Sequence, residues 1–186
     1  MNEFTEFPKM ARLSRRVIIT EKLDGTNAQV VITDDGVMRF GSRTRWITPQ
    51  DDNQGFAAWA QHNRESLLGL GVGRHFGEWW GSGIQRRYGL AEKRFSLFNA
   101  ERWGASRPEC CHVVPMLFDG PFSTDMAQLM ITNLAAFGSV AAPGFMDPEG
   151  VICFHTAANI GFKKTIKKDE MPKSSIDWLA KQGATA

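Results

Sequence analysis

The strongest local signal for chemistry in this sequence of 186 residues is a lysine followed two residues later by an Asp-Gly pair. It lies in the run Glu21-Lys22-Leu23-Asp24-Gly25-Thr26-Asn27. The β-branched residues before it predict that Lys22 leaves a strand just before Gly25 lets the chain turn into the next strand. Because a glycine also permits close approach by a ligand, Lys22 is a candidate nucleophile. On these residues alone, an exposed hairpin lysine is the alternative.

Further fragments follow this run in a particular order. They are Ser42-Arg43-Thr44, Phe76-Gly77-Glu78-Trp79-Trp80-Gly81, Phe95-Ser96-Leu97-Phe98, Glu149-Gly150-Val151-Ile152 and a cluster made of Lys163, Lys164, Lys167 and Lys168. The order resembles the covalent nucleotidyltransferase superfamily of ATP-dependent ligases and mRNA capping enzymes, and the resemblance spans residues 21–168. Within that superfamily the first run is most similar to the RNA ligase 2 group, since DNA ligases usually carry arginine at the position of Asn27.

The resemblance implies a three-step reaction. Lys22 would attack the α-phosphate of ATP, form Lys22-AMP and expel pyrophosphate; AMP would then pass to an RNA 5′-phosphate, and a 3′-hydroxyl would displace it to seal the strand. A free lysine has a pKa near ~10.4, so desolvation and the cationic neighbours Lys163 and Lys164 are expected to favour the neutral amine. The same lysines would neutralise charge in the transition state.

Which lysine is the main cation is open at this stage. Lys163 is favoured because it begins a Lys-x-Thr pattern. Thr165 occupies the place where many relatives keep a second lysine, so Lys164 or Lys167 could supply the second charge.

The other site residues take their roles from the resemblance as well. Glu149 and Asp24 are expected to hold hydrated Mg²⁺, which takes one or two carboxylates alongside substrate phosphates. The nucleotide would be bound by Glu149 together with four further residues, and the acceptor 3′ end by a fifth. These are Glu21 at the adenine edge, Glu78 at the ribose hydroxyls, Phe98 stacked on the adenine, Arg43 at a phosphate or the ribose, and Asn27 at the 3′ end.

The elements that must position these residues read as an α+β fold of antiparallel sheets with flanking helices. Strands are expected at 16–21, 27–33, 37–40, 74–80, 95–100, 112–118, 151–155 and 160–166, and helices at 56–68, 125–137 and 175–181. Asp51, Asp52 or Asn53 would cap the first helix, and Ser123 or Thr124 the second. The expectation is one nucleotidyltransferase (adenylation) domain over 1–186, with no appended OB-fold.

Composition narrows the class of protein. With Lys+Arg 22 against Asp+Glu 20, the net charge of +2 excludes nucleic-acid binding by bulk charge alone. No apolar run approaches the roughly 20 residues of a membrane-spanning helix, and the acidic start lacks a secretory signal. Three cysteines without metal-ligand or disulfide spacing favour a reduced, cytoplasmic protein. We expect a monomer without a membrane partner.

The sequence therefore predicts an ATP-dependent RNA ligase that uses ATP and Mg²⁺ and acts on RNA, with a nicked duplex as its substrate because a complementary strand aligns the two ends. A DNA ligase core and a GTP-using capping guanylyltransferase are the catalytic alternatives. A nucleic-acid end-binding module without turnover is the alternative of another class.

Overall fold

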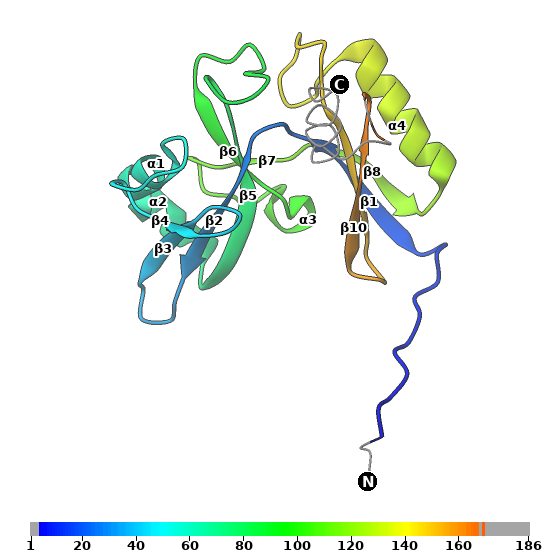
Figure 1. Cartoon of the computed structure of the whole chain (residues 1–186), viewed down its shortest axis with the longest axis horizontal. Coiled ribbons are helices and arrows are strands. Elements are labelled where there is room, and N and C mark those ends of the chain that lie inside the picture. Colours follow the sequence, from blue (N-terminus) through cyan, green and yellow to red (C-terminus); the bar gives the residue numbers. More distant parts are fainter. Residues whose placement is uncertain (1–3, 168, 170–186) are drawn as a thin grey trace, which may run out of the picture.

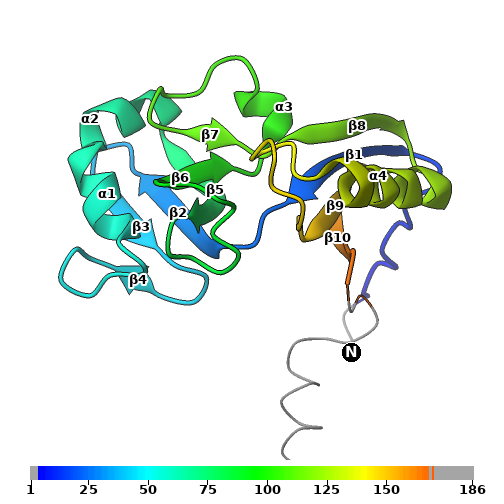
Figure 2. The same cartoon turned by 90° about the horizontal axis from the view of Figure 1, so that it is seen from above.

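Two β-sheets face each other in the computed structural model, which describes residues 4–167 and 169. Figure 1 shows one sheet with α1 and α2 on its outer side and the other with α4 on its outer side, and Figure 2 shows the same division from above. The inner faces of the two sheets are therefore left to flank a binding site. Among the described residues, no helix is long and apolar enough to cross a membrane.

The smaller sheet has four strands in the order β10-β9-β1-β8. Their bounds are Arg16–Lys22 for β1, Met116–Pro121 for β8, Gly150–His155 for β9 and Ile160–Thr165 for β10. All three pairings are antiparallel. The sheet brings β1, the first strand of the chain, next to β8 and β9, which come from the second half of the sequence.

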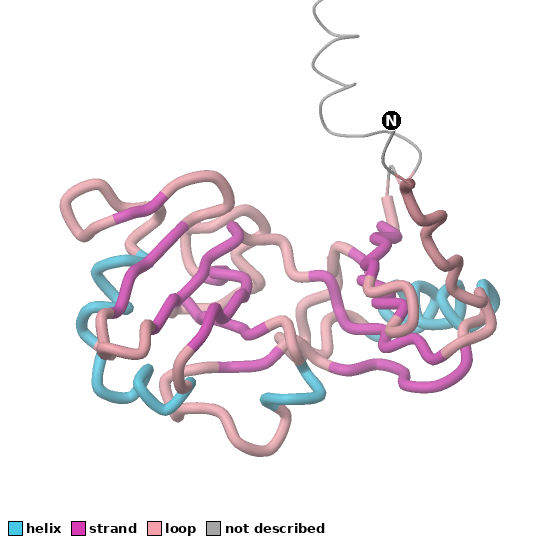
Figure 3. The backbone as a smooth tube through the Cα atoms, turned by 90° about the horizontal axis from the view of Figure 1, so that it is seen from below, coloured by secondary structure: helices cyan, strands magenta, loops and turns pink. Residues whose placement is uncertain are grey.

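The larger sheet has six strands in the order β4-β3-β2-β5-β6-β7. Their bounds are Thr26–Ile32 for β2, Met38–Gly41 for β3, Trp46–Ile47 for β4, Gly73–Gly81 for β5, Lys93–Leu97 for β6 and His112–Val113 for β7. The helical elements are α1 (Phe56–His62), α2 (Arg64–Leu67), η1 (Leu68–Leu70), α3 (Ala100–Trp103) and α4 (Thr124–Phe137). Figure 3 shows the loops, in pink, that connect these short elements.

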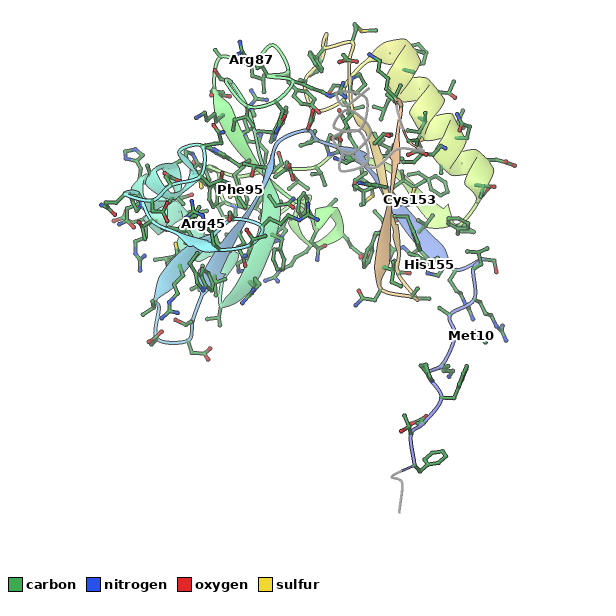
Figure 4. All side chains as sticks on the ribbon, viewed as in Figure 1. Met10, Arg45, Arg87, Phe95, Cys153 and His155 are labelled. Atoms are coloured by element: carbon green, nitrogen blue, oxygen red, sulfur yellow. The ribbon has the colours of Figure 1, made fainter. Side chains whose placement is uncertain are left out.

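Each sheet has its own hydrophobic core on its outer face. Phe56 and Ala60 of α1 pack with Phe95 and Trp79 under the larger sheet. Under the smaller sheet, Cys153 packs with residues of α4 and of β1. Figure 4 labels Phe95 and Cys153 in these two separate cores. Alternate residues of each strand fill a core, so the residues between them must face the inner side.

The α+β class and most predicted strands are confirmed, whereas several boundaries differ. The helix expected at 56–68 divides at Asn63, whose φ and ψ of −97° and 18° are not helical. The strand expected at 112–118 divides at Pro115, which has no N–H to donate to a ladder. The strand expected at 95–100 ends at Leu97, and α3 begins at Ala100. One pairing, β6 with β7, is parallel.

The helix starts are only partly as predicted. The carboxylate of Asp52 accepts hydrogen bonds from the backbone N–H groups of Ala57 and Ala58, so it satisfies donors in the first turn of α1. Ser123 is the N-cap residue of α4, but its side chain makes no capping hydrogen bond. The helix expected at 175–181 lies outside the described residues.

Candidate active site

Lys22 ends β1 and lines a cavity of about 610 Å³ between the two inner faces. The side chains of Ile18 and Thr20 precede it on the same face of β1, because alternate strand residues share a face. The chain then passes through Leu23, Asp24 and Gly25 into β2 of the other sheet. A Cβ atom on Gly25 would come within 2.8 Å of the Trp80 Cβ, so glycine is required where the chain crosses between the sheets.

Two carboxylates surround the Lys22 amine. Its Nζ donates to Oε2 of Glu149 across 2.5 Å, and the Glu149 side chain is only 7% exposed. Glu78 is buried as well, and its charge interacts with both Lys22 and Glu149. Lys22 is thus held in place at the end of β1 by its ion pair with Glu149.

Burial raises the pKa of Glu78 to about 7. The positive charge of Lys22 and hydrogen bonds from Asn27 Nδ2 (2.9 Å) and the Gly25 backbone N–H (3.1 Å) oppose this shift without cancelling it. Glu78 is therefore a carboxyl group that changes charge near neutral pH inside the cavity.

A stability measurement tests the state of Glu78. Between about pH 4.5 and 7 the folded protein retains a proton that the unfolded chain has released, so the free energy of unfolding should fall as the pH rises through this interval. Glu78→Gln, which resembles the protonated group, should remove most of this fall. It should stabilise the fold at pH 8 by roughly 3 kcal/mol, at about 1.36 kcal/mol per pKa unit. Urea unfolding at pH 5 and pH 8 measures both effects.

The control for this prediction is Glu92→Gln, because Glu92 is exposed and pairs with Arg94 on the surface. It should leave the pH dependence unchanged. If Glu78→Gln and the original protein lost stability in parallel between pH 5 and pH 8, Glu78 would not be the titrating group.

Glu21 is 1% exposed and is bound differently from the sequence expectation. Its carboxylate accepts hydrogen bonds from Ser139 Oγ (2.6 Å) and from the backbone N–H groups of Val140 and Ala141 (2.9 Å each). Burial raises its pKa, and these three hydrogen bonds oppose the rise. The contacts tie β1 to the loop after α4. Glu21 also lines the cavity, and its role at the adenine edge stays a prediction.

Asp24 likewise has a partner on the protein. Arg86 Nε donates to Asp24 Oδ2 at 3.0 Å, and the same guanidinium pairs with Asp147. The backbone N–H of Asp24 donates to the buried Tyr88 hydroxyl. Asp24 is not among the residues that line the cavity. The predicted pairing of Asp24 with Glu149 as joint metal ligands is therefore not supported by these contacts.

The register of β10 separates the candidate lysines. Lys163 lies opposite Ile152 on the inner face and lines the cavity. Lys164 lies opposite Val151, a residue of the outer core, and its amine is 3.5 Å from Asp169. Lys167 pairs with Asp147 at 2.7 Å. Lys163 therefore lies at the cavity and Lys164 on the other side of the sheet, and the roles of both as cations stay predictions.

Three further predicted residues line the cavity from the larger sheet. Phe98 and Arg43 are both at its wall, and neither is buried. Asn27 also lines it, although its amide already donates to Glu78. Several other residues that line the cavity were not predicted from the sequence, among them Ile18, Thr20, Val114, Asn99, Glu101, Ile152 and Phe154. Ile18 and Thr20 could have been found by counting back from Lys22 in steps of two.

The cavity suits a nucleoside phosphate and a hydrated divalent cation. Lys22, Arg43 and Lys163 supply positive charge for phosphates in the described part of the chain, and Phe98 supplies an aromatic face. No group of three or more His, Cys, Asp or Glu side chains that could hold a metal ion occurs among the described residues. Mg²⁺ keeps several waters and needs only one or two carboxylates besides substrate phosphates. Glu149 does not line the cavity itself, but it contacts the Lys22 amine there and stays the predicted carboxylate for that ion.

Comparisons with known proteins define the class. The family model for RNA ligase matches residues 15–167, which include all the elements that form the cavity, so this chain belongs to the RNA ligase family. A comparison with curated proteins found no match.

Solved structures of one ligase share the fold. A variant of the Naegleria gruberi RNA ligase with ATP and Mn has a TM-score of 0.62 at 21% identity, covering 83% of this chain and 51% of that one. The same ligase with PPi gives 0.60 at 21% identity, over 82% and 50% of the two chains. A variant with AMP and Mn gives 0.59 at 19% identity, over 82% and 50%. This chain therefore has the nucleotidyltransferase fold of an RNA ligase and spans about half the length of those proteins.

Proposed function

We propose that this protein is an ATP-dependent RNA ligase whose Lys22 becomes covalently adenylylated. The observation that carries the proposal is the position of Lys22 at a cavity between the sheets, next to Glu149 and with Lys163 lining the cavity from the same sheet. The family match and the ATP, AMP and PPi complexes of the Naegleria gruberi ligase support it.

The first step is attack by the Lys22 amine on the α-phosphate of ATP. Lys22 attacks as the neutral amine, so the proton of its ammonium group passes to solvent; the nitrogen–phosphorus bond forms, and the bond from the α-phosphorus to the bridging oxygen breaks as pyrophosphate leaves. Lys163 and Arg43 line the cavity where charge develops on the phosphate oxygens, and fixed cations there stabilise the transition state. A divalent cation at Glu149 would add Lewis-acid stabilisation of the same phosphates and compete with Lys22 for the carboxylate.

The later steps use the same centre. An RNA 5′-phosphate displaces Lys22 from AMP, and the RNA 3′-hydroxyl then displaces AMP to form the phosphodiester bond. The ribose hydroxyls of the nucleotide fit Glu78, whose carboxyl oxygens face the cavity alongside Asn27. Phe98 provides a stacking surface for the base. Glu21 lines the same cavity and is the predicted contact for the adenine edge, besides its hydrogen bonds to residues 139–141.

Labelling with radioactive nucleotide tests the proposal. The full chain is incubated with Mg²⁺ and either α-labelled ATP or α-labelled GTP, and then separated by denaturing electrophoresis. Label retained from ATP supports the ligase. Label from GTP alone would show a capping guanylyltransferase, and a protein that retains neither label would fit the end-binding module. Joining assays on matched RNA and DNA ends then separate an RNA ligase from a DNA ligase core.

A substitution at Glu149 tests its predicted contact with the divalent cation. Glu149→Ala should slow adenylylation about 100-fold, comparable to the loss of other preorganised active-site contacts, and should flatten its dependence on Mg²⁺ concentration. Single-turnover labelling across a Mg²⁺ titration measures both. Glu92→Ala removes an exposed carboxylate and should change neither. If Glu149→Ala kept the original Mg²⁺ response, Glu149 would be only the ion-pair partner of Lys22.

The arrangement of the RNA ends is a separate question. From the sequence, a nicked duplex is expected, because the complementary strand removes much of the entropic cost of aligning the ends. The inner face of the larger sheet supplies a structural reason to expect the opposite preference, and one experiment distinguishes the two.

A further inference from the structure

Aromatic side chains form a row across the inner face of the larger sheet. Trp46 pairs with Gly41, Gly41 with Gln29, and Gln29 with Phe76 in the registers of β4, β3, β2 and β5. The Phe98 backbone N–H donates to the Phe76 carbonyl at 3.0 Å, which continues the row to the cavity. Trp46, Phe76 and Phe98 are 49%, 51% and 41% exposed. Such large apolar rings are exposed together at the edge of the proposed active site.

Gln29 fills the space between Trp46 and Phe76. A Cβ on Gly41 would meet the Gln29 side chain at 2.9 Å, so the glutamine lies directly over the glycine. Its Nε2 donates to the Ser42 carbonyl at 3.1 Å, which fixes the amide across the strands. The row from Trp46 to Phe98 is therefore one continuous surface without a deep gap.

Arginines lie beside this surface. Val31 pairs with both Arg39 and Arg74, which places the two guanidinium groups in the next row of the same face. The Arg74 guanidinium carbon lies 5.8 Å from the Trp46 ring centroid and 6.0 Å from that of Phe76. Within the described residues, neither Arg74 nor Arg43 forms an ion pair with a carboxylate. Arg39 lies near the carboxylate of Asp35.

We propose that Trp46, Phe76 and Arg74 bind unpaired nucleotides of the RNA strand whose end enters the cavity. This inference rests on the proposed function. Flat aromatic rings stack on bases of any sequence, and cations beside them contact the phosphates, which is the usual combination at single-strand sites. The unpaired arginines make an anionic polymer a better match than an apolar protein segment, and the continuation to Phe98 leads directly to Lys22.

The bases must be unpaired to use this surface fully. In an RNA duplex the faces of the bases are covered by stacking within the helix, and proteins contact such duplexes mostly through their shape and backbone. The surface thus favours ends with single-stranded nucleotides over the fully paired nick expected from the sequence.

Affinity measurements on the full chain test the proposal. The probe is an unpaired RNA about ten nucleotides long with a 5′-phosphate, and its Kd is measured by fluorescence anisotropy at one salt concentration. Trp46→Ala and Phe76→Ala should each weaken binding about tenfold, within the range known for loss of one base–aromatic stack. Arg74→Ala should also weaken binding and lower the salt dependence of the Kd, because it removes a phosphate contact.

Conservative variants distinguish stacking from general loss of apolar surface. Phe76→Tyr keeps an aromatic face and should bind within twofold of the original protein, on the order of the scatter expected for a retained stack. Phe76→Leu should bind as weakly as Phe76→Ala. Phe137→Ala is the matched control, since Phe137 ends α4 and is 79% exposed but far from this row in the sheet arrangement. It should leave the Kd unchanged.

Equal RNA affinity of Phe76→Tyr and Phe76→Leu would overturn the inference. So would a fully paired nicked RNA duplex that binds as tightly as the unpaired RNA. Labelling by ATP is measured in parallel on the original protein. If the original protein is not labelled, the proposed function is contradicted. If it is labelled but Trp46→Ala and Phe76→Ala bind RNA with unchanged affinity, only the stacking surface is contradicted.

Discussion

Lys22→Ala should abolish formation of the covalent protein–AMP adduct. The nitrogen that forms the bond to phosphorus is removed, so the expected loss is complete rather than partial. The fold should persist, because the Lys22 side chain is 21% exposed and takes no part in the hydrophobic clusters. Labelling with α-labelled ATP and Mg²⁺ measures the adduct, and thermal unfolding checks the fold.

Lys9→Ala is the control for this experiment, since it removes an exposed lysine in the segment before β1. It should be labelled as strongly as the original protein. An acid-labile AMP adduct on Lys22→Ala would show that another residue is the nucleophile. Such a result would remove the central assignment of the site.

Lys163→Ala should slow adenylylation about 100-fold, whereas its neighbour Lys164→Ala should leave the rate nearly unchanged. Lys163 lines the cavity, and loss of one preorganised contact to a developing charge typically costs two to three orders of magnitude, roughly 3–4 kcal/mol. Lys164 lies on the outer side near Asp169. Single-turnover rates at saturating ATP compare the two variants.

This pair of variants is a strict test because the two substitutions are chemically identical and adjacent in the chain. A larger effect of Lys164→Ala would mean that β10 is shifted by one residue, since such a shift exchanges the two faces of a strand. Equal, small effects would remove the proposed transition-state role of this strand. Measuring the labelling rate at low and at high ATP concentration would show whether any loss is in ATP binding or in the chemical step.

The local pattern of the sequence was sufficient for the fold class and most of the strands, and together with the order of the motifs it indicated the candidate nucleophile. β-branched runs such as 16–21 predict strands because the period of two is a short-range property of the chain. Lys22 could be identified since its neighbours in the motif, Asp24 and Gly25, are also its neighbours in sequence. The same reasoning placed Phe98, Arg43 and Glu78 in one site through their order along the chain, and all three line the cavity.

Tertiary structure alone decided which groups those side chains contact. Glu21 is next to Lys22 in sequence, yet its carboxylate is bound by residues 139–141, more than a hundred positions away. Asp24 is bound by Arg86 across a similarly non-local contact. Such partners depend on how distant segments pack, which no local periodicity records.

Strand register was the other property that required the structure. Lys163 and Lys164 are equivalent in composition and nearly so in sequence context, but only one of them can face the cavity once β10 pairs with β9. The aromatic row of Trp46, Phe76 and Phe98 arises in the same way from the pairing of separate strands. The sequence by itself indicated which residues are candidates for the chemistry; the long-range hydrogen-bond register of the sheets determined which of them meet, because a shift of one residue would turn each side chain to the opposite face.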